Sequence, residues 1–261
     1  MKYALSSIMF PPEELDRAID YANELGIELE IFPMWHTEAF CRFVRERSSD
    51  LRGLVGSFHE PYHFSDHSFQ RGTKEHDQTM ALCRKTFEIA REIGAKNIVF
   101  HHNNRPVTEA EKADMLNWSA ENLHMMNEIA AEYGIPYLVE NAGVLPKGNV
   151  LFDQEEFIAL FDAIPNDCLL DLGHAHCNGW DIPRVITALK GKIVAYHFHD
   201  NDKTSDSHKR LGEGTLALEQ FGKLYATHTP NAQIILEYVE GTKATVSDLK
   251  KELEVLKGVC T

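Results

Sequence analysis

Residues 193–199 read IVAYHFH, an apolar run that ends in two histidines. A short continuous run of this kind is typical of a strand that is covered on both faces, as in a parallel sheet. Seven further runs share this design, each bounded by Gly, Pro, Asn or Asp. They are YALSSIM (3–9), GIELEIF (26–32), LVGSFH (54–59), NIVFHH (97–102), PYLVEN (136–141), CLLDL (168–172) and QIILEY (233–238). The sequence therefore predicts eight strands.

Segments with helical spacing separate these runs. Residues 11–26 begin with two prolines and stop at Gly26, which is a common way for a helix to begin and end. Residues 108–134 place Thr108 three positions before Glu111, a capping-box pattern. The other predicted helices cover residues 74–94, 154–163, 181–190, 216–227 and 246–257.

Strands that alternate with helices pair in parallel, and eight such units close most naturally into a (β/α)₈ barrel. The length of 261 residues is close to the ~250 that such a barrel usually needs. No linker or low-complexity tract divides the chain, so residues 1–261 are expected to form a single TIM-barrel domain. A doubly wound open sheet is the alternative, but no GxGxxG motif follows the first strand.

Bulk composition restricts the class of partner. The formal net charge of −14 argues against a nucleic acid, because phosphate binding depends on Lys and Arg. No apolar stretch approaches the ~20 residues of a membrane span, and Pro11 and Pro12 break the first apolar run too early for a signal peptide. The five cysteines form no CxxC pair and are expected to be reduced thiols. We therefore expect a cytoplasmic protein without a membrane partner, and a homo-oligomer stays open.

Residues that can bind a metal stand at the ends of six consecutive predicted strands. They are His59, His101 beside His102, Glu140, Asp171 followed by His174, His197 with His199, and Glu237. The C-terminal strand ends of a (β/α)₈ barrel form one rim, and this rim carries the active site. Burying several carboxylates together is costly, and a divalent cation removes that cost. The pattern therefore predicts a metal at the mouth of the barrel.

Glu140, Asp171, His197 and Glu237 form a mixed oxygen and nitrogen ligand set. Such a set favours Mn²⁺, Zn²⁺, Co²⁺ or Fe²⁺ over Mg²⁺. Strand alternation puts His197 and His199 on the same side, so one would bind the metal while the other lines the pocket just outside it.

Further candidates stand in two other places. After the seventh strand, Asp206 and His208 are two positions apart, and Lys209 or Arg210 would receive a phosphate or carboxylate of the substrate. After the second strand, Trp35 would wall the pocket, with a plain core role as the alternative. Glu30 would hydrogen-bond a ligand or a metal-bound histidine.

These motifs resemble the xylose-isomerase-like TIM-barrel superfamily, which groups sugar isomerases and epimerases, inosose dehydratases, hydroxypyruvate isomerases and endonuclease-IV-type apurinic endonucleases. The resemblance spans the chain and is most specific at VEN (139–141), LDLGHAH (170–176), HFHDND (197–202) with the D-x-H and LGEG that follow, and LEY (236–238). It implies a metal held by Glu140, Asp171, a histidine of the seventh strand and Glu237. The family pattern favours His197, but ketose 3-epimerases use the second of two histidines here, which leaves His199 open.

The resemblance implies first an isomerase or epimerase of a sugar, sugar phosphate or related polyol that acts by proton transfer through an enediolate. Glu140 and Glu237 would remove and return the proton. The implied substrate-binding residues are His59, His101, His174, His199 and His208, to which Arg210 and Trp35 are added from the residues alone.

Two alternatives use the same barrel mouth. The endonuclease branch holds three zinc ions, and its additional ligands fall on His59, His101, His174, Asp206 and His208, all of which this sequence has. A lyase or dehydratase acting on a sugar or an inosose would use the same metal site. Ketose 3-epimerases usually carry an Arg where His208 stands, so this sequence departs from their pattern at that position.

Overall fold

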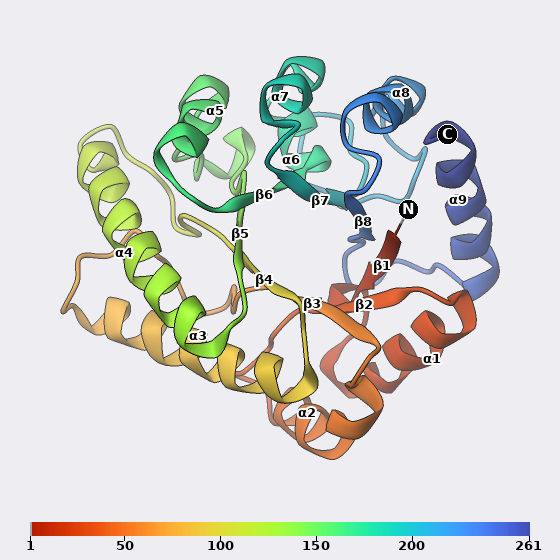
Figure 1. Ribbon diagram of the computed structural model, residues 1–261, viewed down its shortest axis with the longest axis horizontal. Helices are drawn as coiled ribbons and strands as arrows, with labels where there is room; N and C mark the ends of the chain where they lie inside the picture. Colours follow the sequence, from red (N-terminus) through yellow and green to blue (C-terminus); the bar gives the residue numbers. More distant parts are fainter. Residues whose placement is uncertain (1) are drawn as a thin grey trace.

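A computed structural model describes residues 2–261 and shows a closed parallel barrel with surrounding helices. The strands pair in sequence order, and β8 pairs with β1 to close the ring (Figure 1). They are β1 (Lys2–Ser6), β2 (Glu28–Ile31), β3 (Val55–Phe58), β4 (Asn97–Phe100), β5 (Tyr137–Glu140), β6 (Asp167–Asp171), β7 (Ile193–Phe198) and β8 (Gln233–Leu236). The predicted (β/α)₈ barrel is confirmed, and each strand lies within or at the edge of its predicted run.

Helices ring the barrel on its outside (Figure 1). They are α1 (Asp16–Leu25), α2 (Glu38–Leu51), α3 (Lys74–Ile93), α4 (Lys112–Tyr133), α5 (Gln154–Ala163), α6 (Leu172–Cys177), α7 (Ile182–Leu189), α8 (Leu218–His228) and α9 (Val246–Val259). Short 3₁₀ turns are η1 (Ser7–Met9), η2 (Pro12–Glu14) and η3 (Leu145–Lys147). Among the described residues, no helix is long and apolar enough to cross a membrane.

Two helices of the structure were not predicted, and one predicted helix cap is wrong. The helices α2 and α6 were not predicted, although Thr37 caps α2 by accepting a hydrogen bond from the backbone NH of Phe40. The predicted cap at Thr108 is wrong, because α4 begins at Lys112. The Thr108 hydroxyl instead donates to the Glu111 carboxylate at 2.9 Å, which removes it from the backbone NH that a capping box would use.

The core has two layers that follow the period of two along each strand. Side chains facing outward pack against the helices and form most of the core. Those facing inward form a separate small cluster of Ala4, Val99, Leu138, Leu169, Ala195 and Ile235. Adding two residues to each inward position gives Ser6, His101, Glu140, Asp171, His197 and Glu237. Because successive side chains alternate between faces, these residues also face inward, one layer nearer the mouth.

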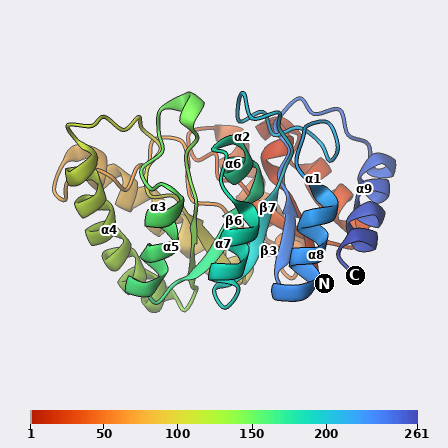
Figure 2. The ribbon, with the colours of Figure 1, turned by 90° about the horizontal axis from the view of Figure 1, so that it is seen from above.

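The loops that follow the strands gather at one end of the barrel (Figure 2). The segment after β5 (green) and the long segment after β7 (blue) extend furthest at this end.

His102 does not belong to the polar layer at the mouth. It follows the inward His101 and therefore faces outward, where its ring packs on Phe152 at 4.4 Å between centroids. The fold thus presents an apolar barrel interior covered by a polar layer at the mouth.

Candidate metal centre at the barrel mouth

A pocket of about 320 Å³ opens at the C-terminal ends of the strands. Its polar lining includes His59, His101, Glu140, His174, Asp206, His208 and Glu237. Its apolar walls include Ile8, Phe32, Met34, Val144 and Val239. A mainly apolar pocket with a few convergent polar groups suits a small ligand.

His197 is the point at which three strand-end carboxylates converge. Its Nδ1 lies 3.4 Å from Glu140 Oε2, 3.6 Å from Glu237 Oε2 and 3.8 Å from Asp171 Oδ2. No more than 4% of any of these four side chains is exposed. The four residues come from β5, β6, β7 and the end of β8, so the barrel itself fixes their relative positions.

Three histidines of the centre have one ring nitrogen held by an acceptor other than the three carboxylates. The pairs are His59 Nδ1 with the Glu60 carbonyl (2.9 Å), His101 Nδ1 with Asn104 Oδ1 (3.0 Å) and His197 Nε2 with Glu30 Oε1 (3.0 Å). Each donating nitrogen directs the other one into the centre, as is usual for metal-binding histidines. Glu30 therefore has the predicted contact with a histidine of the centre.

Several ligand atoms in the centre are buried and lack a hydrogen-bond partner among residues 2–261. They are Glu140 Oε1, His174 Nδ1, His197 Nδ1, His199 Nδ1 and Asp206 Oδ1. Buried polar atoms are normally satisfied, so a set of them in one place needs an explanation. These residues belong to overlapping groups of three or four imidazole and carboxylate atoms that all lie within 4.8 Å of one another. Such a donor set fits a divalent transition metal.

Charges in the centre balance one another. Burial raises the pKa of Glu237 to about 7, against the opposing charge of His197. Burial also acts to raise the pKa of Glu140, but His101 and His197 outweigh it and hold that pKa well below its usual value. Burial lowers the pKa of His197, yet Glu237, Glu30 and Glu140 raise it well above its usual range. The carboxylates therefore require nearby positive charge, from protonated imidazoles or from a cation.

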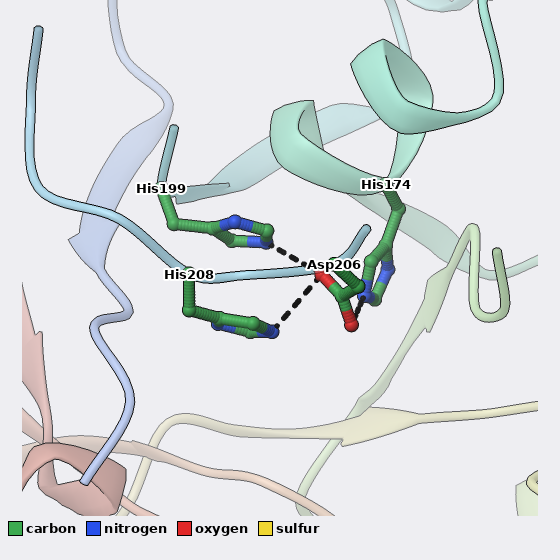
Figure 3. Close-up of side chains that lie close together, drawn as sticks. All are labelled: His174, His199, Asp206 and His208. Atoms are coloured by element: carbon green, nitrogen blue, oxygen red, sulfur yellow. Dashed lines mark ion pairs between the residues drawn. The ribbon is translucent and has the colours of Figure 1, made fainter. Parts of the chain in front are cut away.

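A second cluster lies beside this centre and contains His174, His199, Asp206 and His208 (Figure 3). Asp206 stands between His174 on one side and the stacked rings of His199 and His208 on the other. The nitrogen-to-oxygen distances from Asp206 are 3.5 Å to His174, 3.8 Å to His199 and 3.2 Å to His208. The motif LDLGHAH and the D-x-H motif, both of which the sequence analysis singled out, therefore lie side by side in this cluster.

A family model for the xylose isomerase-like TIM barrel matches residues 30–259. The chain belongs to this family. It is 25% identical over 272 residues to the protein named Probable endonuclease 4 from Natranaerobius thermophilus. The aligned region covers 92% of this chain and 93% of that protein.

Solved structures share the fold of this xylose isomerase-like chain. A D-tagatose 3-epimerase-like protein is similar with a TM-score of 0.80 and 20% identity, over 99% of this chain and 97% of that chain. The IOLI protein with a binding zinc atom is similar with a TM-score of 0.77 and 16% identity, over 100% of this chain and 98% of that chain.

Three residues predicted to bind substrate do not line the pocket of this family member. The Arg210 Nε donates to Glu252 at 2.7 Å, so the guanidinium is paired with α9. The Trp35 ring packs on Phe40, and its Nε1 donates to Thr86 at 2.8 Å. His199 is fully buried behind the pocket lining. By contrast, His59, His101, His174 and His208 do line the pocket.

The sequence interpretation missed Lys147 and Tyr62, which also line the pocket. Lys147 Nζ donates to Asp206 Oδ2 at 2.7 Å, and among the pocket-lining residues that the structure describes, it is the lone lysine or arginine. Both residues belong to loops, where no periodic pattern marks a side chain as inward. Only the position of the PK pair in the loop after the fifth strand could have suggested Lys147.

Proposed function

We propose that this chain is a divalent-metal-dependent isomerase or epimerase of a sugar, sugar phosphate or related polyol. The observation that carries the proposal is that Glu140 and Glu237 line one small pocket and both face His197 Nδ1. Two carboxylates on one ligand can remove a proton and return one, which is what epimerisation or isomerisation requires. The similarity to a D-tagatose 3-epimerase-like protein supports the same class of substrate.

Glu140, Asp171, His197 and Glu237 would hold the metal, with zinc, manganese or cobalt preferred to magnesium for this donor set. When bound, a divalent cation supplies Lewis-acid polarisation of a substrate carbonyl and so acidifies the neighbouring C–H bond. The zinc atom named for the IOLI protein makes zinc the first ion to test.

The chain's own residues then divide the remaining work. Glu140 and Glu237 take up and deliver the proton at the reacting carbon. His59, His101 and His174 hydrogen-bond substrate hydroxyls from the polar lining. The apolar walls, with Phe32 and Met34, exclude water, which strengthens each of these electrostatic contacts. These roles depend on position, since the barrel fixes each strand end.

A zinc-dependent nuclease is the second candidate, favoured by the cluster around Asp206 and by the endonuclease 4 relative. The charge of the pocket lining argues against a nuclease. A phosphodiester backbone is held mainly by Lys and Arg, and among the described lining residues only Lys147 offers such a charge. A lyase remains compatible with the same site, because an enolate that expels a β-hydroxyl needs the same proton removal.

Glu140→Gln tests the proposal directly. The variant should abolish turnover while sparing the fold, because glutamine keeps the size of the side chain and removes the proton acceptor. The purified protein is first assayed for bound metal by elemental analysis, then against ketoses, aldoses, their phosphates and abasic duplex DNA. Glu155→Gln on the surface of α5, where the carboxylate pairs with Arg184, is the matched control and should keep full activity.

The outcomes separate the candidates. Turnover of a sugar that disappears in Glu140→Gln and persists in Glu155→Gln supports the proposal. Unchanged sugar turnover in Glu140→Gln removes this mechanism. Cleavage of the abasic DNA without any turnover of sugars assigns the nuclease function.

A further inference from the structure

We propose that Lys147, together with Asn149 and Tyr62, forms an anion-binding subsite, so that the substrate carries a phosphate or a carboxylate group. This inference rests on the proposed function and narrows its substrate class from any sugar or polyol to an anionic one. None of the three residues belongs to the metal ligands that the resemblance implies.

The pocket has a single lysine or arginine to receive an anion. Lys209 and Arg210, which the sequence suggested for this role, are paired with Asp202 at 3.0 Å and with Glu252 at 2.7 Å and do not line the pocket. Among the lining residues that the structure describes, Lys147 alone carries such a charge. The formal net charge of the chain is −14, so an anionic group needs a local cation to enter a pocket that is lined by carboxylates.

Lys147 keeps hydrogen-bonding capacity after its contact with Asp206. An ammonium group has three N–H donors, and Nζ donates one of them to Asp206 Oδ2 at 2.7 Å. The other two donors have no acceptor among residues 2–261. Asp206 also has His208 Nε2 at 3.2 Å and His174 Nε2 at 3.5 Å, so it does not depend on the lysine alone. Half of the Lys147 side chain is exposed, which leaves the ammonium open to a ligand.

Two neutral donors line the same pocket. Asn149 is only 6% exposed, and its Oδ1 accepts from the Val144 backbone NH at 2.9 Å. The Nδ2 end of this amide therefore remains without an acceptor among the described residues, and so does the Tyr62 hydroxyl. Buried polar groups are normally satisfied, so free donors in one pocket indicate a ligand that is rich in acceptor oxygens. Phosphate and carboxylate groups are such ligands, and they form the stronger, charge-assisted hydrogen bonds.

The backbone around Lys147 and Asn149 is held in place by side chains from other segments. Lys147 ends η3, in the segment after β5 that extends furthest at the mouth (Figure 2). Asn178 Nδ2 donates to the Gly143 carbonyl at 2.9 Å, and Asn103 Nδ2 donates to the Asn149 carbonyl at 2.9 Å. The loop is therefore ordered before a ligand arrives, which lowers the entropic cost of binding.

The test measures binding and so does not depend on turnover. Zinc-loaded protein is titrated by isothermal titration calorimetry with D-fructose, D-fructose 6-phosphate and D-fructuronate, which differ from one another only at carbon 6. Lys147→Gln removes the positive charge, and Lys147→Arg keeps it. Lys112→Gln is the matched control, since Lys112 pairs with Glu156 at 2.9 Å and does not line the pocket.

We expect at least one anionic probe to bind the wild type more tightly than D-fructose does, and the preferred probe identifies the anionic group. Lys147→Gln should weaken the binding of that probe by roughly 10-fold, the lower end for a hydrogen bond between charged groups, because Lys147 is half-exposed. Lys147→Arg and Lys112→Gln should keep most of the affinity. Wild-type affinity of Lys147→Gln for both anionic probes overturns the inference, and so does D-fructose binding as tightly as both anions.

Asn149→Asp is a second, independent variant. Aspartate keeps the oxygen that accepts from Val144 and exchanges the amide donor for a negative charge. It should weaken the binding of the anionic probe and leave D-fructose binding unchanged, and an unchanged affinity for the anion contradicts the subsite. Circular dichroism checks folding. If Asn149→Asp does not fold, Tyr62→Phe takes its place, because it removes a hydroxyl and keeps the ring.

Binding and turnover together separate this inference from the proposed function. If anion binding depends on Lys147 but no sugar or sugar phosphate is turned over, the proposed function alone fails. If neutral sugars are turned over equally by the wild type and by Lys147→Gln, and no anionic probe binds more tightly than D-fructose, this inference alone fails.

Discussion

Replacing Glu30 by glutamine should weaken zinc binding to the proposed metal centre without changing any proposed ligand. Glu30 is fully buried, accepts from His197 Nε2 at 3.0 Å and from Ser57 at 2.9 Å. The carboxylate thereby orients the His197 ring and increases the basicity of the nitrogen that faces Glu140, Asp171 and Glu237. Glutamine keeps an acceptor oxygen but removes the charge.

The expected magnitude follows from this contact. Partners that orient a metal-bound histidine contribute roughly 10–100-fold to metal affinity, which corresponds to about 1.4–2.7 kcal/mol. We expect Glu30→Gln to fall in this range, because both side chains are fully buried and solvent does not screen the pair. The zinc dissociation constant is measured by competition with a chromophoric chelator at fixed pH.

Glu28→Gln is the control for this experiment. Glu28 stands two residues earlier on β2, and its carboxylate pairs with Lys96 and Gln233 instead of with a histidine. The zinc affinity of the Glu28→Gln variant should equal that of the wild type. Equal affinities for Glu30→Gln and the wild type would refute the reasoning, since the orienting hydrogen bond would then have no effect on the metal.

Two other predictions concern packing and charge around the mouth. His67 and Glu60 form a fully buried pair, 3.0 Å apart. The variant His67→Gln should lose about 3–5 kcal/mol of unfolding free energy, because it leaves the Glu60 charge buried without a partner. The double variant with Glu60→Gln should recover much of this loss, and urea denaturation measures both. Burial lowers the pKa of His67, but Glu60 outweighs it and raises that pKa to about 10, so this stabilisation is complete below about pH 6.5 and lost as the pH rises toward 10. A pH-independent stability would contradict this charge state. Gly173→Ala should displace the His199 ring and cost about 1–3 kcal/mol of unfolding free energy, and a wild-type melting temperature would show that the ring has room to spare.

The sequence alone determined the barrel and the polar layer at its mouth. Continuous apolar runs mark strands covered on both faces, and the period of two places Glu140, Asp171, His197 and Glu237 on the inward side, two positions beyond an apolar residue that also faces inward. These are local properties of single strands, and they hold whatever the loops do. Closure of eight units then brings the strand ends together.

Only the tertiary structure decided what happens between strands and loops. It placed Lys147 in the pocket, turned Arg210 toward Glu252 and buried Trp35 against Phe40. It also separated His197, which faces three carboxylates, from His199, which lies on Gly173. The two histidines share one face of the strand and are equivalent in the sequence pattern. Their surroundings differ because contacts from α6 and from the loop after β7 are made through space, and no period along the chain records them.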